Sequence, residues 1–426
     1  MKTDPYRKTT LDNGVRIISC PMKDRRSLAL GIWVGVGSRY ERPASAGISH
    51  YLEHMVFKGT SKYTCRQIKE SIEGVGGSFN GFTSEEVTCY FVKMPLRYLD
   101  RGIDILSDMV ARPLLREEDI RKERTVILEE IKMYKDQPHS YVYELLDGLM
   151  WPGHPLGTST LGTEATVSAV DRAALEAYRT ACYSPSNIVV SAAGAFDHGA
   201  LVRKAGSRLG KLDRGARNRY VPARQAQAAP QVRILAKDTE QSHLVIGFHG
   251  LRRDDPMRYG LSLLHIILGA NSSSRLFNEV REKRGLAYEI GTHVKFMADT
   301  GVFIVHAGVD NKKVEDTVKL VFEGLQRVRD RRVTADELQR AKEYYLGQLT
   351  LAMEDTMDQM LWIGETTTTL DRTFCLEDVM REVKKVSAED IRIVGRMLFK
   401  TERVNFAMIG PWKNKEQSVK AWCRLK

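Results

Sequence analysis

The chain has 426 residues, of which 42% are hydrophobic and 28% are charged, and its formal net charge is +11 at pH 7. This composition is typical of a globular protein and excludes a disordered chain, and no stretch approaches the roughly 20 apolar residues of a membrane helix. The basic residues are interleaved with 54 acidic ones rather than gathered into a tail, so we expect neither nucleic acid nor a membrane as a partner.

The N-terminal segment from Met1 to Gly14 contains acidic residues and no apolar run, which is unlike a secretory signal or a transit peptide and predicts a cytoplasmic protein. The six cysteines are scattered singly, as expected for reduced thiols rather than a disulfide framework. The hydrophobic pattern then predicts, in chain order, strands at 15–19 and 28–36, helices at 46–57 and from the capping box at 64–67, a strand at 87–94, helices at 96–111 and 117–135, further helices, and a strand at 188–193.

Residues 213–230 are rich in Arg, Ala and Gln without clear periodicity, and we interpret them as a linker. After them the same order of elements returns, with strands at 232–235 and 244–248, helices at 257–268 and 274–283, a hairpin turning near 298–301, helices at 314–328 and 335–352, and a strand at 404–409. The length and the repetition predict two homologous domains, 1–212 and 231–426. Strands grouped with runs of helices favour an α+β sandwich with an antiparallel-rich sheet in each domain.

The segment GISHYLEHMVF contains His50, Glu53 and His54 as an HxxEH motif. At 100° per residue these three side chains fall within one arc of about 100° on the predicted helix. Two imidazoles at i and i+4 can bind one zinc ion, and the carboxylate between them can act on a water, which is the inverted form of the HExxH site. Because a motif this short also arises by chance, a third ligand is needed to support it.

The helix predicted at 117–135 supplies that ligand. Its apolar stripe is formed by residues 120, 127, 131 and 134, and both Glu123 and Glu130 lie at the edge of this stripe. A carboxylate on a core face needs a cation or a donor, whereas Glu129 lies on the opposite side of the helix. We therefore predict Glu130 as the third ligand. Glu123 either supports a ligand from two turns away or forms a salt bridge with a Lys or Arg.

The second half of the chain is an internal control. Aligning Gly47 with Gly260 places Leu263, Ile266 and Ile267 opposite His50, Glu53 and His54, and Gln348 falls opposite Glu130. The repeated fold therefore forms without these polar residues, and we expect a single metal site in the first domain.

The HYLEH motif, followed by Glu130 within ERTVILEEI, resembles the pitrilysin or insulinase family of zinc metallopeptidases, in particular the short bacterial relatives of the mitochondrial processing peptidase. The likeness extends along nearly the whole chain, through GGSFNGFTSEEVTCYF at 76–91, SPSNIVVSAAGAFD at 184–197 and SSRLFNEVREKRGLAYEIG at 273–291. The resemblance implies zinc held by His50, His54 and Glu130, with Glu53 as general base.

The resemblance further implies that 76–91 forms an edge strand that binds a peptide substrate by strand addition, with Asn80 and Thr83 shaping the cleft. Gly81 stands where the family commonly has Ala. Arg281 and Tyr288 match the pair that the family brings to the zinc from its second half to bind substrate and stabilise the oxyanion. The family encloses short or unstructured peptides in a clamshell of four domains, of which this chain supplies two.

These observations predict a zinc endopeptidase that acts as a homodimer, or as a heterodimer with a related subunit. One alternative is a non-catalytic or partner-dependent subunit of a heterodimeric peptidase, because related chains keep the fold and have lost the ligands. Another alternative is a zinc enzyme that cleaves a different amide.

Overall fold

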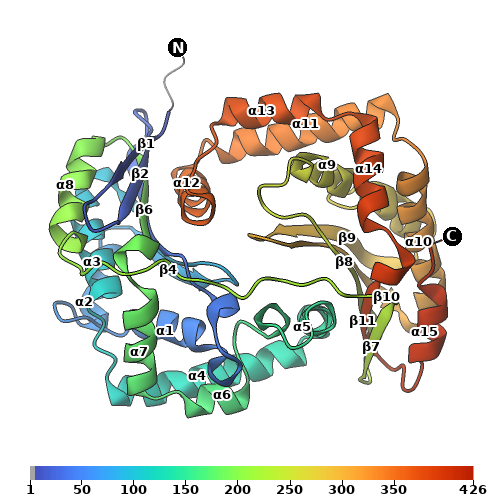
Figure 1. Cartoon of the computed structure of the whole chain (residues 1–426), viewed down its shortest axis with the longest axis horizontal. Helices are drawn as coiled ribbons and strands as arrows, with labels where there is room; N and C mark the ends of the chain where they lie inside the picture. Colours follow the sequence, from blue (N-terminus) through green and yellow to red (C-terminus); the bar gives the residue numbers. More distant parts are fainter. Residues whose placement is uncertain (1–4, 426) are drawn as a thin grey trace. The chain divides into compact units, whose positions relative to one another are not determined.

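The computed structural model describes residues 5–425, which form two compact units (Figure 1). Unit 1 contains the chain up to Lys132 together with residues 158–221 and 349–376. Unit 2 contains residues 133–157, 222–348 and the chain from Glu377 onward. Each unit is a sheet packed with helices, and this confirms the α+β class predicted from the sequence.

The sheet of unit 1 has six strands in the order β1-β2-β6-β3-β5-β4, and all neighbours are antiparallel except β2 and β6. Its strands are β1 (Arg7–Thr10), β2 (Arg16–Pro21), β3 (Ser27–Val34), β4 (Ser78–Thr83), β5 (Thr88–Pro95) and β6 (Ile188–Gly194). Strand β4 lies at one edge, where it pairs only with β5.

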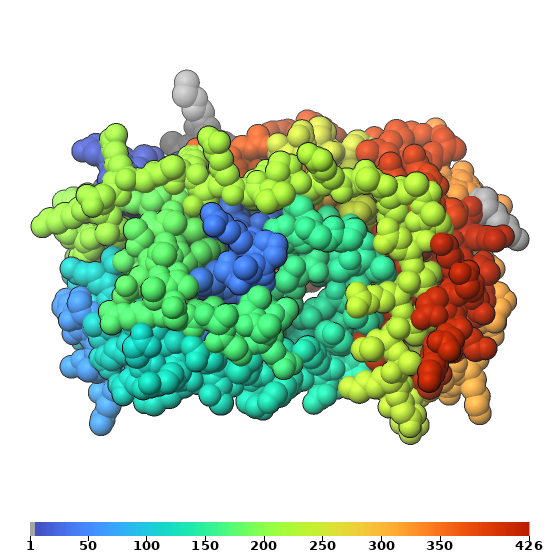
Figure 2. Space-filling model, turned by 60° about the horizontal axis from the view of Figure 1, so that its bottom comes forward, coloured from blue at the N-terminus to red at the C-terminus, as the bar shows by residue number. Residues whose placement is uncertain are grey.

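Side chains of β3 alternate between two cores, as the period of a strand requires. Leu28, Leu30 and Ile32 face the larger core, together with buried residues of the surrounding helices. The helices of this unit are α1 (Ile48–Val56), α2 (Cys65–Glu73), α3 (Leu99–Ala111), α4 (Glu117–Asp136), α6 (Glu164–Ala169), α7 (Arg172–Cys182), α8 (His198–Leu209) and α12 (Thr356–Leu370). On the surface α4 and α6 lie side by side (Figure 2), and there Arg124 donates to the carbonyl of Val170 at 2.7 Å.

The other face of this sheet is covered by α12, which comes from the second half of the sequence. Two glycines permit the close approach. A Cβ on Gly31 would lie 2.5 Å from Met360 Sδ, and one on Gly364 would lie 2.0 Å from Trp33 Nε1. The Trp33 indole instead donates to Ser191 Oγ at 2.8 Å. A helix distant in sequence therefore completes the core of unit 1.

The sheet of unit 2 has five strands in the order β7-β11-β8-β10-β9, with β7 and β11 parallel and the other pairs antiparallel. Its elements are β7 (Gln231–Ala236), β8 (Gln241–His249), β9 (Ala287–Phe296), β10 (Gly301–Asp310), β11 (Asn405–Gly410), α5 (Pro138–Met150), α9 (Arg258–Leu268), α10 (Val314–Asp330), α11 (Ala335–Ala352), α13 (Leu376–Lys385), α14 (Ala388–Leu398) and α15 (Glu416–Trp422). Helix α5, from the first half of the sequence, packs Val142, Leu145 and Leu146 onto this sheet.

The order β2-β6-β3-β5-β4 in unit 1 is matched strand for strand by β7-β11-β8-β10-β9 in unit 2. The two sheets therefore share one topology, as the repeated order of elements predicts. The compact units nevertheless exchange α5 and α12, so they are not contiguous in sequence. Between α8 and β7, residues 213–230 have no regular secondary structure, as expected of a linker.

One element differs in type from the sequence expectation. The segment predicted as an α-helix at 274–283 is mainly a π-helix, from Phe277 to Glu282. Its turn is widened, since the Lys283 amide donates to the carbonyl of Asn278 and the Leu286 amide to that of Val280, both at 3.0 Å. Gly285, with φ of +57°, ends the segment in the left-handed region that favours glycine. Wide turns of this kind are frequent at functional sites.

Candidate metal centre

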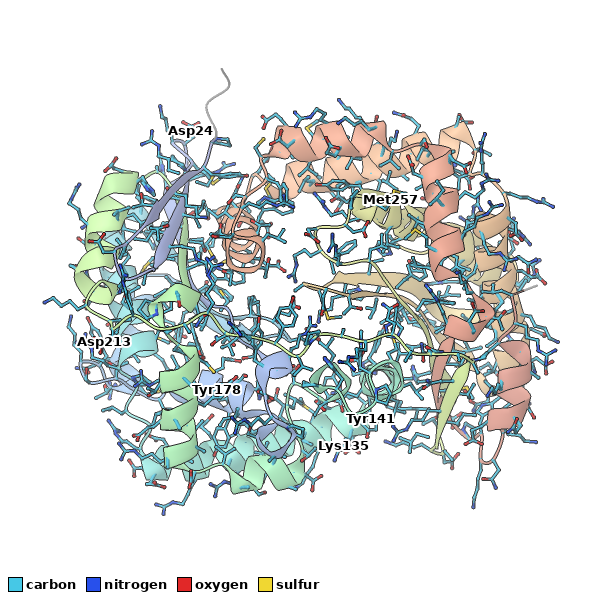
Figure 3. All side chains as sticks on the ribbon, viewed as in Figure 1. Asp24, Lys135, Tyr141, Tyr178, Asp213 and Met257 are labelled. Carbon is cyan, nitrogen blue, oxygen red and sulfur yellow. The ribbon has the colours of Figure 1, made fainter. Side chains whose placement is uncertain are left out.

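Helix α1 carries the HxxEH motif, and its start is held by a carboxylate. Glu41 accepts the amides of Gly47 at 2.7 Å and Ser49 at 2.8 Å, and so satisfies donors that a helix N-terminus leaves free. Burial raises the pKa of Glu41 to about 7, although these hydrogen bonds oppose the shift. The Ser49 hydroxyl also lies 2.6 Å from the hydroxyl of Tyr178 on α7 (Figure 3). No sequence pattern pointed to Glu41.

Gly47 precedes α1 with φ of +91°, a conformation that glycine adopts without strain. A Cβ there would also lie 2.5 Å from the carbonyl oxygen of Leu161. At the other side of the helix, Tyr51 is fully buried and donates its hydroxyl proton to the carbonyl of Ile120 on α4 at 2.5 Å. These contacts fix α1 against α4, which carries the third predicted ligand.

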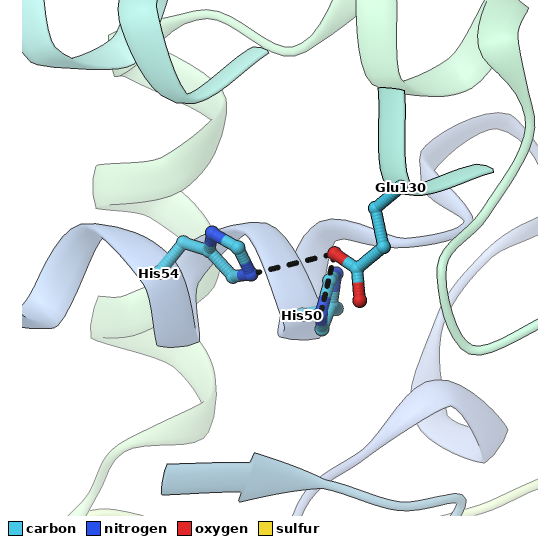
Figure 4. A group of neighbouring side chains, drawn as sticks. All are labelled: His50, His54 and Glu130. Carbon is cyan, nitrogen blue, oxygen red and sulfur yellow. Dashed lines mark ion pairs between the residues drawn. The ribbon is translucent and has the colours of Figure 1, made fainter. Parts of the chain in front are cut away.

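The structure brings His50, His54 and Glu130 together (Figure 4). The Nε2 atoms of both histidines lie 3.7 Å from Glu130 Oε2, and the three ligand atoms all lie within 4.8 Å of one another. The neighbouring Glu129 is exposed and instead pairs with Lys132 at 2.8 Å. Among residues 5–425, this is the group whose His, Cys, Asp or Glu side chains lie close enough to hold a metal ion.

The pKa values of the two imidazoles are shifted in opposite directions. Burial, helped by the charge of His54, lowers the pKa of His50 to about 3, so His50 is neutral at pH 7 and available as a ligand. Burial also acts to lower the pKa of His54, but the hydrogen bond with Glu123 and the charges of Glu53 and Glu130 outweigh it and raise this pKa.

Glu123 lies behind His54. Its Oε2 is 3.0 Å from His54 Nδ1, and its Oε1 is 2.5 Å from Lys58 Nζ. Burial acts to raise the pKa of Glu123, but the hydrogen bonds from His54 and Lys58 prevail and lower it. Glu123 therefore contacts the predicted ligand His54 and also forms a salt bridge with Lys58. Lys58 is a residue that the sequence analysis did not identify, although it lies one turn after His54.

Glu53 is buried beside the group, and burial raises its pKa, with a smaller contribution from the charge of Glu130. Thr83 donates its hydroxyl proton to Glu53 Oε2 at 3.2 Å. A Cβ on Gly81 would lie 3.1 Å from Glu53 Oε1, so glycine leaves this side of the carboxylate open. Asn80 alternates with these residues along β4 and is exposed, with its Oδ1 accepting the Gly81 amide at 2.9 Å.

Arg281 and Tyr288 belong to unit 2, at the π-helix and at the start of β9. The Arg281 guanidinium carbon lies 5.5 Å from the centre of the Tyr288 ring and 4.8 Å from that of Phe277. Tyr288 is 74% exposed. The two predicted residues are therefore neighbours, presented together to solvent.

Two imidazoles, a carboxylate and a second, buried carboxylate are the residue types of an inverted HxxEH metal site. Comparison with known families agrees with this class, since the insulinase family (peptidase family M16) matches residues 16–164 and the peptidase M16 inactive domain matches residues 169–345. The chain belongs to the insulinase family, peptidase family M16.

Relatives cover almost the entire chain. An uncharacterized zinc protease of Streptomyces coelicolor is 38% identical over 97% of this chain and 91% of its own length. The uncharacterized zinc protease YmxG of Bacillus subtilis is 34% identical over 96% of this chain and 99% of its own length. A crystal structure of a protease from Helicobacter pylori has the same fold, with a TM-score of 0.89 and 22% identity, covering 95% of this chain and 99% of that one. None of the helices among residues 5–425 combines the length and apolarity of a membrane span.

Proposed function

We propose that this protein is a zinc-dependent endopeptidase that hydrolyses short or unstructured peptides. The observation that carries the proposal is the cluster of His50, His54 and Glu130 with Glu53 on the same helix face. A structural metal site generally has four protein ligands, whereas three ligands beside a buried carboxylate are typical of catalytic zinc.

The donor set fits zinc. Neutral imidazole nitrogens and one carboxylate oxygen are its common ligands, and the depressed pKa of His50 keeps that ligand unprotonated. When bound, zinc supplies a Lewis acid at the position these three residues share. Glu53 accepts the proton of the attacking water, because burial has made its carboxylate more basic than usual. It then delivers this proton to the leaving amine, while Thr83 holds the carboxylate in position.

The substrate class follows from strand β4. This strand forms the edge of its sheet, its Thr83 donates to Glu53, and its Gly81 leaves room beside that carboxylate. A peptide that pairs with such an edge must be extended and have free backbone donors and acceptors. We therefore expect cleavage within unfolded segments and no cleavage at internal sites of a stable folded protein.

Arg281 and Tyr288 are proposed to bind substrate and to stabilise the developing oxyanion. In a homodimer with two-fold symmetry, these side chains of one copy would serve the metal site of the other. Mixing an inactive Glu53→Gln chain with an inactive Arg281→Ala chain tests this arrangement. Random exchange would restore about a quarter of normal activity if the site is shared between copies. Verified exchange without recovery would show that Arg281 does not act across subunits.

The decisive experiment is digestion of a mixed peptide library by the purified protein, read by mass spectrometry with and without a chelator. We expect cleavage that is lost with the chelator, restored by zinc, and absent in Glu53→Gln although that variant retains the metal. A general base contributes about 10²- to 10⁴-fold to the rate, so the loss should be of that order. Substantial peptidase activity of Glu53→Gln would refute the assigned role.

The alternative is a non-catalytic or partner-dependent subunit. That alternative predicts no cleavage of any peptide by the isolated chain, with or without zinc. The clustering of all three predicted ligands with the buried Glu53 argues against this alternative. A chain without the chemistry would bury these polar groups at a cost in free energy and without benefit. The second alternative, a zinc enzyme that cleaves a different amide, is tested by including small non-peptide amides in the same assay.

A further inference from the structure

Lys58 follows the C-terminal end of α1 and reaches back to the metal centre. Its backbone amide donates to the carbonyl of Met55 at 3.0 Å, which continues the helical turn that carries His54. The next residue, Gly59, has φ of +124° and bridges to Thr64, so the backbone leaves the helix sharply just after Lys58. The lysine therefore lies in the turn that directly follows the helix of the two histidines.

Lys58 pairs with the carboxylate of Glu123, whose burial would cost free energy if it had no partner. The side chain of Glu123 is 8% exposed, and its two oxygens contact different groups, Oε1 with Lys58 at 2.5 Å and Oε2 with His54 at 3.0 Å. The Lys58 contact fixes how the Glu123 carboxylate is oriented, since each of its oxygens is held by a different partner. Without that contact the carboxylate can turn, and the oxygen that faces His54 would lose its position.

The state of His54 depends on that oxygen. A carboxylate at Nδ1 accepts a hydrogen bond from the Nδ1–H group, which leaves the lone pair of the neutral ring on Nε2. Nε2 is the nitrogen that lies 3.7 Å from Glu130. The series Lys58, Glu123 and His54 thus selects the ring nitrogen that faces the proposed metal position.

We propose that Lys58 is a positioning residue for the metal centre, which acts by holding Glu123 so that His54 presents Nε2 as a ligand. This inference rests on the proposed zinc site but not on peptidase activity. Removing an outer partner of a metal-binding histidine commonly weakens metal binding about 10- to 100-fold. An ordinary surface ion pair would have no such effect.

The chain offers a matched control. Lys62 lies in the same loop and also pairs with a carboxylate, that of Asp104, whose other partners are Tyr63 and Arg208 rather than the predicted metal ligands. Lys58→Met should weaken zinc binding about tenfold or more in competition with a chelator of known affinity, and Lys58→Arg should restore most of it. Lys62→Met should bind zinc as the parent protein does. Equal zinc affinity of Lys58→Met and the parent would overturn the proposal.

Two further measurements separate positioning from a general loss of stability. In the metal-free protein labelled with ¹⁵N-histidine, at a pH high enough for the His54 ring to be neutral, the His54 signals should report protonated Nδ1, and Lys58→Met should shift them toward a mixture of tautomers. In a double-mutant cycle, Lys58→Met should have little further effect on zinc affinity once Glu123→Gln is present, because both act through one contact. Additive effects, or an unchanged His54 tautomer in Lys58→Met, would refute the mechanism.

These readouts also distinguish failure of this inference from failure of the proposed function. A protein that cleaves no peptide can still show the tautomer and the Lys58-dependent zinc affinity. A protein that cleaves peptides with unchanged zinc affinity in Lys58→Met keeps the proposed function and loses only this inference.

Discussion

Units 1 and 2 have the same strand order, yet corresponding helices bury different side chains. In unit 1, α1 buries His50 and Glu53 and sets His54 beside Glu130. In unit 2, the positions aligned with the motif on α9 are Leu263, Ile266 and Ile267, all buried. There, Ile266 and Ile267 border a pocket of about 560 Å³ whose rim includes the Arg275–Glu337 ion pair at 2.8 Å.

The difference shows what the shared fold requires. An apolar helix face is sufficient for the sheet and helices to pack, since unit 2 forms with leucine and isoleucine at these positions. Placing imidazoles and carboxylates on the same face costs free energy unless they are paired or bind a metal. Unit 1 compensates for them with contacts from Glu123, Lys58 and Thr83, so the polar cluster on α1 is an addition that the shared fold does not need.

The largest expected effect comes from cutting the chain after residue 212, at the domain boundary predicted from the sequence. A fragment of residues 1–212 lacks α12, which covers Trp33 and other buried residues of the unit 1 sheet. Since burial of a large apolar side chain contributes about 1.5–3 kcal/mol, the loss is on the order of 10 kcal/mol. We expect a fragment without cooperative thermal unfolding. Adding a peptide of residues 349–376 should restore part of the structure, and a stable fragment 1–212 would contradict this prediction.

Next in size is the effect of removing a metal ligand from unit 1. His50→Ala, His54→Ala and Glu130→Gln should each reduce zinc from one per chain to a small fraction, as measured by elemental analysis after dialysis. Glu129→Gln is the matched control, because Glu129 is exposed and pairs with Lys132. Loss of zinc in the Glu129 variant with retention in the Glu130 variant would reverse the assignment.

A smaller effect is expected at Thr83, whose hydroxyl contacts Glu53 but none of the three predicted ligands. Thr83→Val keeps the shape of the side chain and removes one hydrogen bond to a charged group, which is worth about 1.5–3 kcal/mol. We expect kcat to fall about tenfold or more with unchanged zinc content. Ser78→Ala is the control, because Ser78 lies on the same strand with its side chain exposed, and this variant should keep the kcat of the parent. A fall in zinc content would show a ligand-holding role instead.

An effect that appears only as a pH dependence of stability concerns the start of α1, which Glu41 holds in unit 1. Its folded pKa of about 7 lies above the usual value near 4.5, so the folded state binds the proton more tightly than the unfolded state. The free energy of unfolding should therefore decrease as pH rises from about 4.5 to 7, by up to about 3 kcal/mol. Glu41→Gln should remove this component of the pH dependence in urea unfolding of the metal-free protein. An identical pH profile in both proteins would refute it.

Much of the site could be predicted from the sequence because its geometry is local. Residues four apart on a helix share a face whatever the surroundings, so His50 and His54 had to converge once α1 formed. The same reasoning separated Glu130 from Glu129, since the apolar stripe of α4 determines which side is buried. The strands and most helices were predicted for the same reason, as their periods depend only on neighbouring residues.

Other features were decided by the tertiary structure alone. The exchange of α5 and α12 between the units depends on which distant surfaces pack best, and the close approach at Gly31 and Gly364 has no local signature. Likewise, the pairing of Lys58 with Glu123 and the capping of α1 by Glu41 join residues whose side chains meet only after the chain has folded. Local periodicity determines which residues share a face, whereas packing decides which partners that face meets.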